Sequence, residues 1–237
     1  SKAIHVRNTW AKRCDRHLFL SSRDNASLPA VRLCDTDDRA HLWCKTKAGM
    51  RYIHEKYLDD YDWVLKADDD TYVIMENLRQ FLASHSPQEL LYFGCKLQYE
   101  RVKYMMGGAG YVLSRAAVTK FVTVGIGSKT DSSLCLAGTD TGAEDLEMGR
   151  CLQHIGVPAG DSRDDKQMAR FLPISPLHLV LPNSDIYKHV PWFRYYSVYP
   201  HRSGPECCSP TPISFHYVPI NIMYLMDFLL YNVNVIQ

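Results

Sequence analysis

The stretch that most constrains the fold is a short apolar run followed closely by three consecutive acids. Residues 63–65 have the composition of a buried strand, and Asp68, Asp69 and Asp70 come soon after it. Adjacent carboxylates repel one another and resist burial unless a cation lies among them. In an extended segment, Asp68 and Asp70 project to one face and Asp69 to the other. The pattern predicts a strand that ends in two carboxylates on one face, with a solvated acidic turn as the alternative.

Two carboxylates at the end of a strand are typical of a site for a divalent cation. Open α/β sheets bind their ligands at the carboxyl ends of the strands, and carboxylate oxygens suit hard cations. Mg²⁺ or Mn²⁺ held in this way keeps positions open for the oxygens of a diphosphate, and a histidine ligand would favour Mn²⁺. The pattern therefore indicates metal-dependent departure of a diphosphate, with a separate carboxylate available as general base.

Length and charge narrow the class of protein. The chain has 237 residues and no linker-like stretch, which favours a single domain over 1–237. The formal net charge of +1 gives no support to nucleic-acid binding or to bulk membrane binding. No apolar run is long enough to span a bilayer, so membrane attachment would require an anchor that this chain lacks.

The cysteines point to the secretory pathway. The chain has eight cysteines, without the paired C-x-x-C spacing of a zinc site, so disulfides are the better interpretation. The sequon formed by Asn25, Ala26 and Ser27 agrees with that compartment. We predict a disulfide between Cys135 and Cys151, which would tether the loop at 136–142 to the helix that follows it.

Periodicity and turn residues predict an alternation of helices and strands. Helices are expected at 5–13, 42–57, 75–84, 114–121 and 144–154, and strands at 18–20, 31–33, 63–65, 90–93 and 215–217. The glycines at 107, 108 and 110 allow a close approach of backbone to a ligand, or else a tight turn before a strand.

Two groups of side chains in the second half of the chain have more than one interpretation. Glu144, Asp145 and Glu147 begin a predicted helix, where negative charge favours the helix N-terminus without any further role. The dense aromatic stretch at 192–199 is most often packing, although such rings also stack on sugars, so an acceptor site there is plausible.

The sequence resembles the core-1 β-1,3-galactosyltransferases, which are animal type II Golgi enzymes. The matching stretches lie in order along nearly the whole chain: 5–10, 43–47, 62–73, 106–113, 142–151, 159–163, 207–209 and 213–218. The resemblance implies a GT-A-type α/β fold, with a central, mostly parallel mixed sheet flanked by helices. It also implies a donor and metal half at about 1–114 and an acceptor and base half at about 115–237.

The activity implied by the resemblance is transfer of galactose from UDP-galactose, with inversion, to the 3-hydroxyl of GalNAc-α-Ser/Thr on glycoproteins. Mn²⁺ is the implied cofactor. The full-length protein is expected in the Golgi lumen as a type II membrane protein, and a homodimer is a further expectation. Two alternatives stay open, namely a related β-1,3-glycosyltransferase with another UDP-sugar or acceptor, and a non-catalytic relative that acts as a chaperone or lectin. The acidic cluster and Asp145 argue against a non-catalytic role.

The resemblance also implies a role for individual residues. Asp68, Asp70 and His216 would bind the metal, and Asp145 would be the general base. Residues facing the nucleotide or its phosphates would be Arg39, Lys45, Asp68 and Tyr217, and those on the acceptor side would be Trp192 and Glu144. Without the resemblance, a lone histidine such as His216 between two aromatic residues is more often a packed core residue.

The chain departs from the family pattern at two places. Family members have a further strand with a cysteine ahead of the basic helix, so we expect Cys14 to be without its partner here. The family usually has a second tryptophan two residues after the first, where this chain has Arg194, and this difference bears on acceptor preference.

Overall fold

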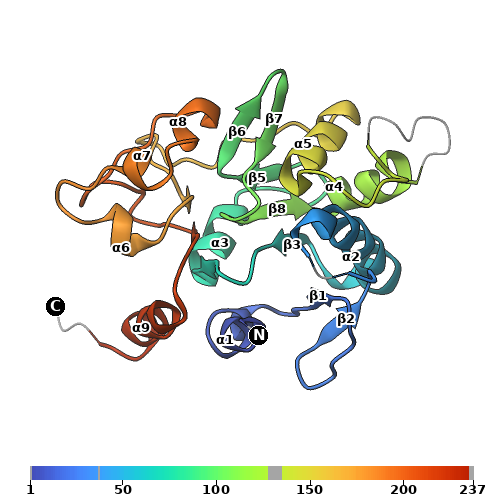
Figure 1. Cartoon of the computed structure of the whole chain (residues 1–237), viewed down its shortest axis with the longest axis horizontal. Coiled ribbons are helices and arrows are strands. Elements are labelled where there is room, and N and C mark those ends of the chain that lie inside the picture. Colours follow the sequence, from blue (N-terminus) through green and yellow to red (C-terminus); the bar gives the residue numbers. More distant parts are fainter. Residues whose placement is uncertain (1, 37, 128–134, 235–237) are drawn as a thin grey trace.

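The computed structural model describes residues 2–36, 38–127 and 135–234. The longer helices are α1 (Ala3–Asn8), α2 (Leu42–Tyr57), α3 (Met75–Leu82), α4 (Arg115–Lys120), α5 (Glu144–His154) and α9 (Ile220–Tyr231). Three single-turn helices, α6 (Pro176–Leu179), α7 (Ile186–His189) and α8 (Phe193–Tyr196), lie together in the C-terminal part (Figure 1). The strands are β1 (Phe19–Ser21), β2 (Ala30–Arg32), β3 (Trp63–Lys66), β4 (Tyr72–Val73), β5 (Tyr92–Gly94), β6 (Lys96–Tyr99), β7 (Val102–Met105), β8 (Tyr111–Ser114), β9 (Phe171–Leu172) and β10 (Ser214–Phe215).

The predicted helices with strong periodicity are confirmed. Helices α2 and α5 have the predicted bounds. Helix α4 begins at Arg115, and Ser114 caps it, because its hydroxyl oxygen accepts a hydrogen bond from the backbone N–H of Ala117 at 3.1 Å. The basic helix predicted at 5–13 is wrong as one element. It starts earlier, as α1, and ends at Asn8, and a separate 3₁₀ turn follows at Ala11–Arg13.

The mixed α/β fold is confirmed, but the central sheet is not mostly parallel. Strand β8 lies between β3 and β5 and pairs antiparallel with both. The hairpin formed by β6 and β7 reverses the chain between β5 and β8, so β8 returns antiparallel to β5. Parallel pairing occurs between β1 and β2 and between β9 and β10.

The central sheet separates two hydrophobic cores. Alternate residues of β8 enter different cores, with Val112 on one face and Tyr111 and Leu113 on the other. Helices α2, α4 and α5 cover the face of Tyr111, whereas α3 and the C-terminal helices contribute to the core that contains Val112 (Figure 1). The acidic stretch follows the end of β3, one of the outer strands of this sheet.

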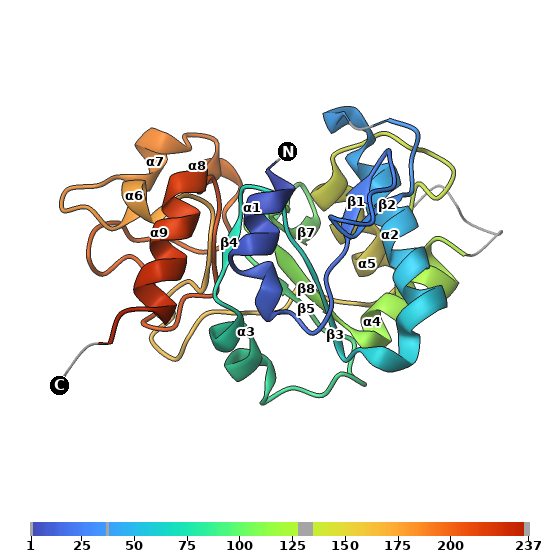
Figure 2. The same ribbon diagram turned by 90° about the horizontal axis from the view of Figure 1, so that it is seen from below.

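The two ends of the described chain pack against each other. Helix α9 lies beside α1, as both views show (Figure 2). Asp227 of α9 accepts hydrogen bonds from Arg13 at 2.5 Å and from Lys12 at 3.0 Å. None of the helices in the described parts of the chain is long and apolar enough to span a membrane.

The predicted disulfide between Cys135 and Cys151 is confirmed. It joins the segment before α5 to the middle of that helix. Two further disulfides, which the sequence did not identify, join Cys34 to Cys44 and the neighbours Cys207 and Cys208. Cys14 and Cys95 are free cysteines.

Candidate metal and transfer site

The three acids form a turn rather than the extended segment that we expected. The backbone N–H of Thr71 donates to the carbonyl oxygen of Asp68 at 3.2 Å, which closes the turn. The turn nevertheless separates the carboxylates as predicted, because Asp68 and Asp70 lie together while Asp69 is half-exposed. The Nζ of Lys2 lies 3.9 Å from Asp69 and 3.5 Å from Asp70.

His216 completes a cluster with these two carboxylates. One ligand atom from each of Asp68, Asp70 and His216 lies within 4.8 Å of the others. The pairing of β10 with β4 brings His216 to the acidic turn, and the backbone N–H of Val218 donates to the carbonyl oxygen of Asp70 at 2.8 Å. Residues that are far apart in the sequence therefore meet where β4 begins and β10 ends, in the sheet with strand order β4-β10-β9.

The cluster has the chemistry of a site for a divalent cation. Two carboxylates and one imidazole are a ligand set that suits a borderline ion such as Mn²⁺. His216 is buried, and its Nδ1 has no hydrogen-bond partner within the described parts of the chain, although buried ring nitrogens are usually paired. His216 Nε2 lies 3.3 Å from Asp70, and this hydrogen bond holds the pKa of Asp70 below its ordinary value. Asp70 is therefore ionised and available as a ligand at neutral pH.

Two glycines in the turn before β8 lie between the cluster and helix α5. A Cβ atom on Gly108 would fall 2.0 Å from the ring of His216, and one on Gly107 would fall 3.3 Å from Cβ of Asp145. The hydroxyl of Thr71 donates to the carbonyl oxygen of Gly108 at 2.7 Å and fixes this turn to the acidic turn. The structure shows the tight turn before a strand that was one of the two expectations, closed by a hydrogen bond from the N–H of Gly110 to the carbonyl oxygen of Gly107 at 3.0 Å. The close approach to a ligand stays a prediction.

Asp145 lies at the start of α5 on the other side of these glycines. Its Oδ2 accepts a hydrogen bond from the backbone N–H of Gly107 at 3.0 Å, and its Oδ1 accepts one from the N–H of Leu146 at 2.9 Å. The side chain of Asp145 is partly exposed, so its remaining lone pairs can accept a proton from a bound molecule.

Glu144, next to Asp145 in the chain, is buried inside a polar network. Its Oε1 accepts hydrogen bonds from Tyr111 at 2.6 Å and Thr46 at 2.9 Å, and its Oε2 lies 3.4 Å from Nζ of Lys66. Burial raises the pKa of Glu144, while the charge of Lys66 opposes this rise. Burial alone would lower the pKa of Lys66, but the carboxylates of Glu144 and Asp68 hold it above its ordinary value.

Sequence reasoning missed Lys66, Thr46 and Tyr111. Of these three residues, only Lys66 could have been identified from the sequence, because it lies two residues before Asp68 in a strand-like stretch. A cation at that spacing falls on the same face as Asp68. Thr46 and Tyr111 carried no such signal, since neither lies next to an acidic residue in the sequence.

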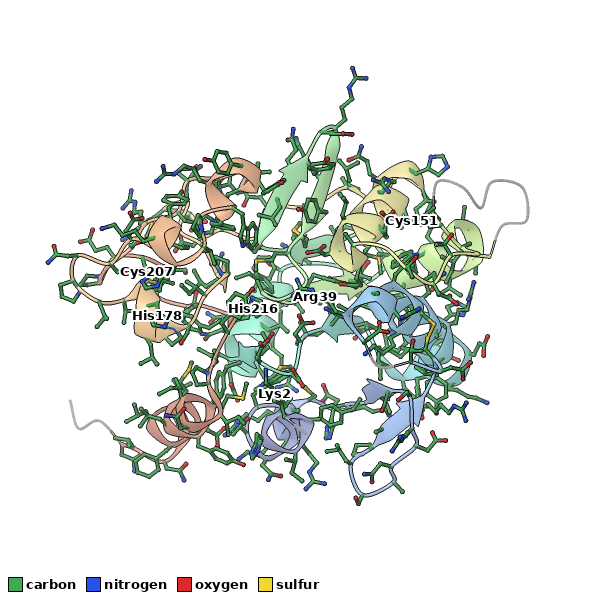
Figure 3. All side chains as sticks on the ribbon, in the orientation of Figure 1. Lys2, Arg39, Cys151, His178, Cys207 and His216 are labelled. Atoms are coloured by element: carbon green, nitrogen blue, oxygen red, sulfur yellow. A yellow bond between two sulfur atoms is a disulfide. The ribbon has the colours of Figure 1, made fainter. Side chains whose placement is uncertain are left out.

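The remaining predicted residues lie around this centre or outside it. Tyr217 stacks on His216 with 3.7 Å between ring centroids and is half-exposed. Arg39 is exposed in a 3₁₀ turn, and Lys45 is partly buried in α2. Trp192 is exposed just before α8 and contacts Phe193 and Tyr196 rather than the cluster. Figure 3 shows Lys2, Arg39 and His216 near the middle of the molecule in that view.

A cavity of about 450 Å³ opens beside the disulfide between Cys34 and Cys44. Its lining combines polar and charged side chains with one leucine and this disulfide, and consists of Arg32, Leu33, Cys34, Asp35, Thr36, His41, Cys44 and Asp140. His41 belongs to the same 3₁₀ turn as Arg39, so this predicted nucleotide residue lies close to the cavity.

The fold and the cluster define a class, namely mixed α/β proteins with a carboxylate and imidazole site between a sheet edge and a helix. A family model described as Fringe-like matches residues 4–164. The chain belongs to the Fringe-like family, whose members are glycosyltransferases with a GT-A-like fold.

Individual relatives agree with this assignment. The chain is 42% identical over 233 residues to glycoprotein-N-acetylgalactosamine 3-beta-galactosyltransferase 1 of Xenopus laevis, and the match covers 98% of this chain and 62% of the relative. It is 32% identical over 177 residues to chondroitin sulfate synthase 3 of Mus musculus, covering 66% and 19% of the two chains. It is 26% identical over 162 residues to beta-1,3-glucosyltransferase of Homo sapiens, covering 66% and 30%. The chain thus spans less than two thirds of the length of these relatives.

Proposed function

We propose that the protein is an inverting, Mn²⁺-dependent transferase that moves galactose from UDP-galactose to the 3-hydroxyl of GalNAc on Ser or Thr of glycoproteins. The observation that carries this proposal is the arrangement of the cluster and Asp145 on the two sides of Gly107 and Gly108. The name of the Xenopus relative, together with 42% identity over almost the whole chain, supports the choice of sugar and acceptor.

Asp68, Asp70 and His216 would hold the metal ion. When bound, Mn²⁺ would supply positive charge against the diphosphate that leaves with the nucleotide. The protein's own part is to present two carboxylates and an imidazole nitrogen at one point, which the hydrogen bond between Asp70 and His216 and the turn at Thr71 achieve.

Asp145 is proposed as the general base. As the 3-hydroxyl oxygen of the acceptor forms a bond to C1 of galactose, the proton of that hydroxyl passes to the carboxylate of Asp145. The bond from C1 to the phosphate oxygen breaks, and its electron pair leaves with UDP. Inversion requires the base on the face opposite the leaving group, which fits a base separate from the metal carboxylates. The hydrogen bonds from Gly107 and Leu146 orient the carboxylate for this role.

The other residues are proposed to bind the two substrates. Arg39, Lys45 and Tyr217 would contact the nucleotide or its phosphates, and the cavity near His41 offers polar groups for that part of the donor. Trp192 would pack on the acceptor sugar, since its exposed ring has the apolar face that sugars stack on. Glu144 would serve the acceptor side through its neighbour Asp145, because its own carboxylate is taken up by protein partners.

The proposal extends to where the protein works. The three disulfides fit the oxidising secretory pathway. We propose that the protein works in the Golgi lumen and that the full-length protein is a type II membrane protein and a homodimer.

The second candidate function is transfer that uses another UDP-sugar or another acceptor, because the names of the relatives include a chondroitin sulfate synthase and a glucosyltransferase.

The test is UDP release from a panel of UDP-sugars with Mn²⁺ and a peptide that carries α-linked GalNAc. The proposal predicts release only with UDP-galactose and only when the acceptor is present. Release with a different UDP-sugar would favour the second candidate. A folded protein that binds the GalNAc peptide but releases no UDP with any donor would instead support a non-catalytic relative.

A further inference from the structure

Lys66 lies between the two halves of the proposed site and touches both. It is the last residue of β3, and its Nζ lies 2.5 Å from Oδ1 of Asp68 and 3.4 Å from Oε2 of Glu144. Asp68 belongs to the metal cluster, and Glu144 is the first residue of α5, directly before Asp145. One ammonium group therefore joins a metal ligand to the helix that carries the proposed base.

Neighbouring residues fix the position of Lys66. Tyr111 lies opposite Lys66 in the β3–β8 register, and Nζ of Lys66 lies 5.8 Å from the centroid of its ring. A Cβ on Gly107 would fall 3.3 Å from this Nζ and 3.0 Å from Oε2 of Glu144, so the glycine leaves just enough room for the ion pair. The side chain of Lys66 is 13% exposed and that of Glu144 is 5% exposed, so water screens this contact weakly.

The charges around Lys66 suggest that it does more than pack against its neighbours. Its one positive charge faces two carboxylates, Asp68 and Glu144. When Asp68 shares its charge with a bound cation, it attracts Lys66 less strongly, and Lys66 interacts more strongly with Glu144. We propose that Lys66 is a positioning residue which couples metal binding at Asp68 to the position of Glu144, and hence to the orientation of Asp145. This inference rests on the metal site of the proposed function.

The coupling can be measured without catalysis, by titrating the protein with Mn²⁺ and reading free Mn²⁺ by electron paramagnetic resonance. Glu144→Gln keeps the acceptor for Tyr111 and Thr46 but removes the charge, which leaves Lys66 paired with Asp68 alone. We expect this variant to bind Mn²⁺ at least about fivefold more weakly than the wild type. In a Lys66→Met background, the same substitution should change the affinity less than about twofold. If Glu144→Gln weakened Mn²⁺ binding equally in the wild type and in Lys66→Met, Lys66 would not couple the two sites.

A matched control separates coupling from loss of stability. Tyr111→Phe removes a hydrogen bond to Glu144 but leaves both charges in place, so it should lower the melting temperature and leave Mn²⁺ affinity within about twofold. If Tyr111→Phe weakened Mn²⁺ binding as much as Glu144→Gln, the effect would be structural and the coupling would be wrong.

A second measurement does not depend on Lys66→Met, which leaves a buried charge unpaired and can fail to fold. Hydrogen exchange of the first turn of α5 should slow when Mn²⁺ is added to the wild type, and this response should be lost in Glu144→Gln. The same response in both proteins, or none in the wild type, contradicts the inference. If Mn²⁺ affinity shows the coupling but the protein transfers no galactose, the inference about Lys66 stands and the proposed donor or acceptor is wrong. If the protein transfers galactose but the effects of the two substitutions on Mn²⁺ affinity are additive, the proposed function stands and the inference about Lys66 is wrong.

Discussion

His216 lies directly over Gly108, and a Cβ atom on that glycine would fall 2.0 Å from Cε1 of the imidazole ring. Carbon atoms do not approach so closely, so only glycine leaves room for the ring at this place. Tyr217 stacks on the ring of His216, with 3.7 Å between the centroids. The glycine turn thus determines where the imidazole can present its nitrogen to the two carboxylates.

Gly108→Ala should therefore displace His216 and weaken metal binding. We expect Mn²⁺-dependent UDP binding to weaken roughly tenfold or more, the size of effect seen when a group that orients a metal ligand is lost. Calorimetry with UDP and Mn²⁺ measures this. Gly138→Ala is the matched control, because a Cβ at Gly138 meets nothing within 4 Å. Unchanged affinity in a folded Gly108→Ala protein would show that His216 does not bind the metal.

The two carboxylates Asp69 and Asp70 are adjacent but should behave differently. Asp70→Ala removes one of the clustered carboxylates and should abolish metal-dependent UDP binding. Asp69→Ala removes a half-exposed carboxylate outside the cluster and should leave the affinity within about threefold. Titration of both variants with UDP and Mn²⁺ gives the comparison. Equal losses would mean that the acidic turn acts only through its total charge.

The ion pairs of Asp227 predict a pH dependence of stability. Burial alone would raise the pKa of Asp227, but the hydrogen bonds from Arg13 and Lys12 hold it below its ordinary value. A carboxylate with a lowered folded pKa stabilises the fold above its unfolded pKa of about 4, and this contribution is lost as the pH falls through the folded pKa. Asp227→Asn should cost about 2 kcal/mol at neutral pH. Urea unfolding from pH 7 downwards should show the difference from the wild type shrinking in acid. A constant difference at every pH would contradict the prediction.

The disulfide between Cys135 and Cys151 should stabilise the fold and hold the segment before α5. Replacing both cysteines by alanine should lower the free energy of unfolding by about 3 kcal/mol, the value of the chain-entropy model for a loop of this length. Urea denaturation measures the change. Cys14→Ala is the control, since Cys14 is not disulfide-bonded, and it should cost about 1 kcal/mol. A double variant as stable as the wild type would mean that the tether adds nothing.

The sequence predicted helices α2 and α5 and the paired carboxylates of the cluster, for physical reasons that can be named, but it missed the 12-residue helix α9. Helix α2 has apolar residues at helical spacing over its whole length, so its bounds followed from periodicity. Asp68 and Asp70 were identifiable because acids after an apolar strand need a partner. His216 and Asp145 needed the family resemblance, since a histidine between aromatics and an acid in a first helical turn both have ordinary structural roles.

The direction of β8 and the polar network around Glu144 could not be predicted in the same way. The antiparallel pairing of β8 depends on the hairpin between β6 and β7, which periodicity did not reveal. The contact of Lys66 with Glu144 joins β3 to α5 across the sheet, and no local pattern encodes a pair so distant in sequence. Between residue 156 and helix α9 the chain consists of single-turn helices, two-residue strands and turns, where there is too little repetition for a periodic signal.

The most direct test of the account is the turnover of Asp145→Asn. The variant keeps the shape of the side chain and can still accept one of the two hydrogen bonds that Gly107 and Leu146 donate to different oxygens of Asp145, but it cannot take up the proton of the acceptor hydroxyl. Glu147→Gln, in the same helical turn and paired with Arg150, controls for the charge at the helix N-terminus.

We predict that Asp145→Asn lowers galactose transfer by roughly 10²–10⁴-fold, with UDP and Mn²⁺ affinity and melting temperature nearly unchanged. Glu147→Gln should retain most of its turnover. An Asp145→Asn protein that keeps more than about a tenth of wild-type turnover would contradict the account, because loss of a general base lowers turnover by more than this. Asp145 would then only stabilise the start of α5, and the base would lie elsewhere.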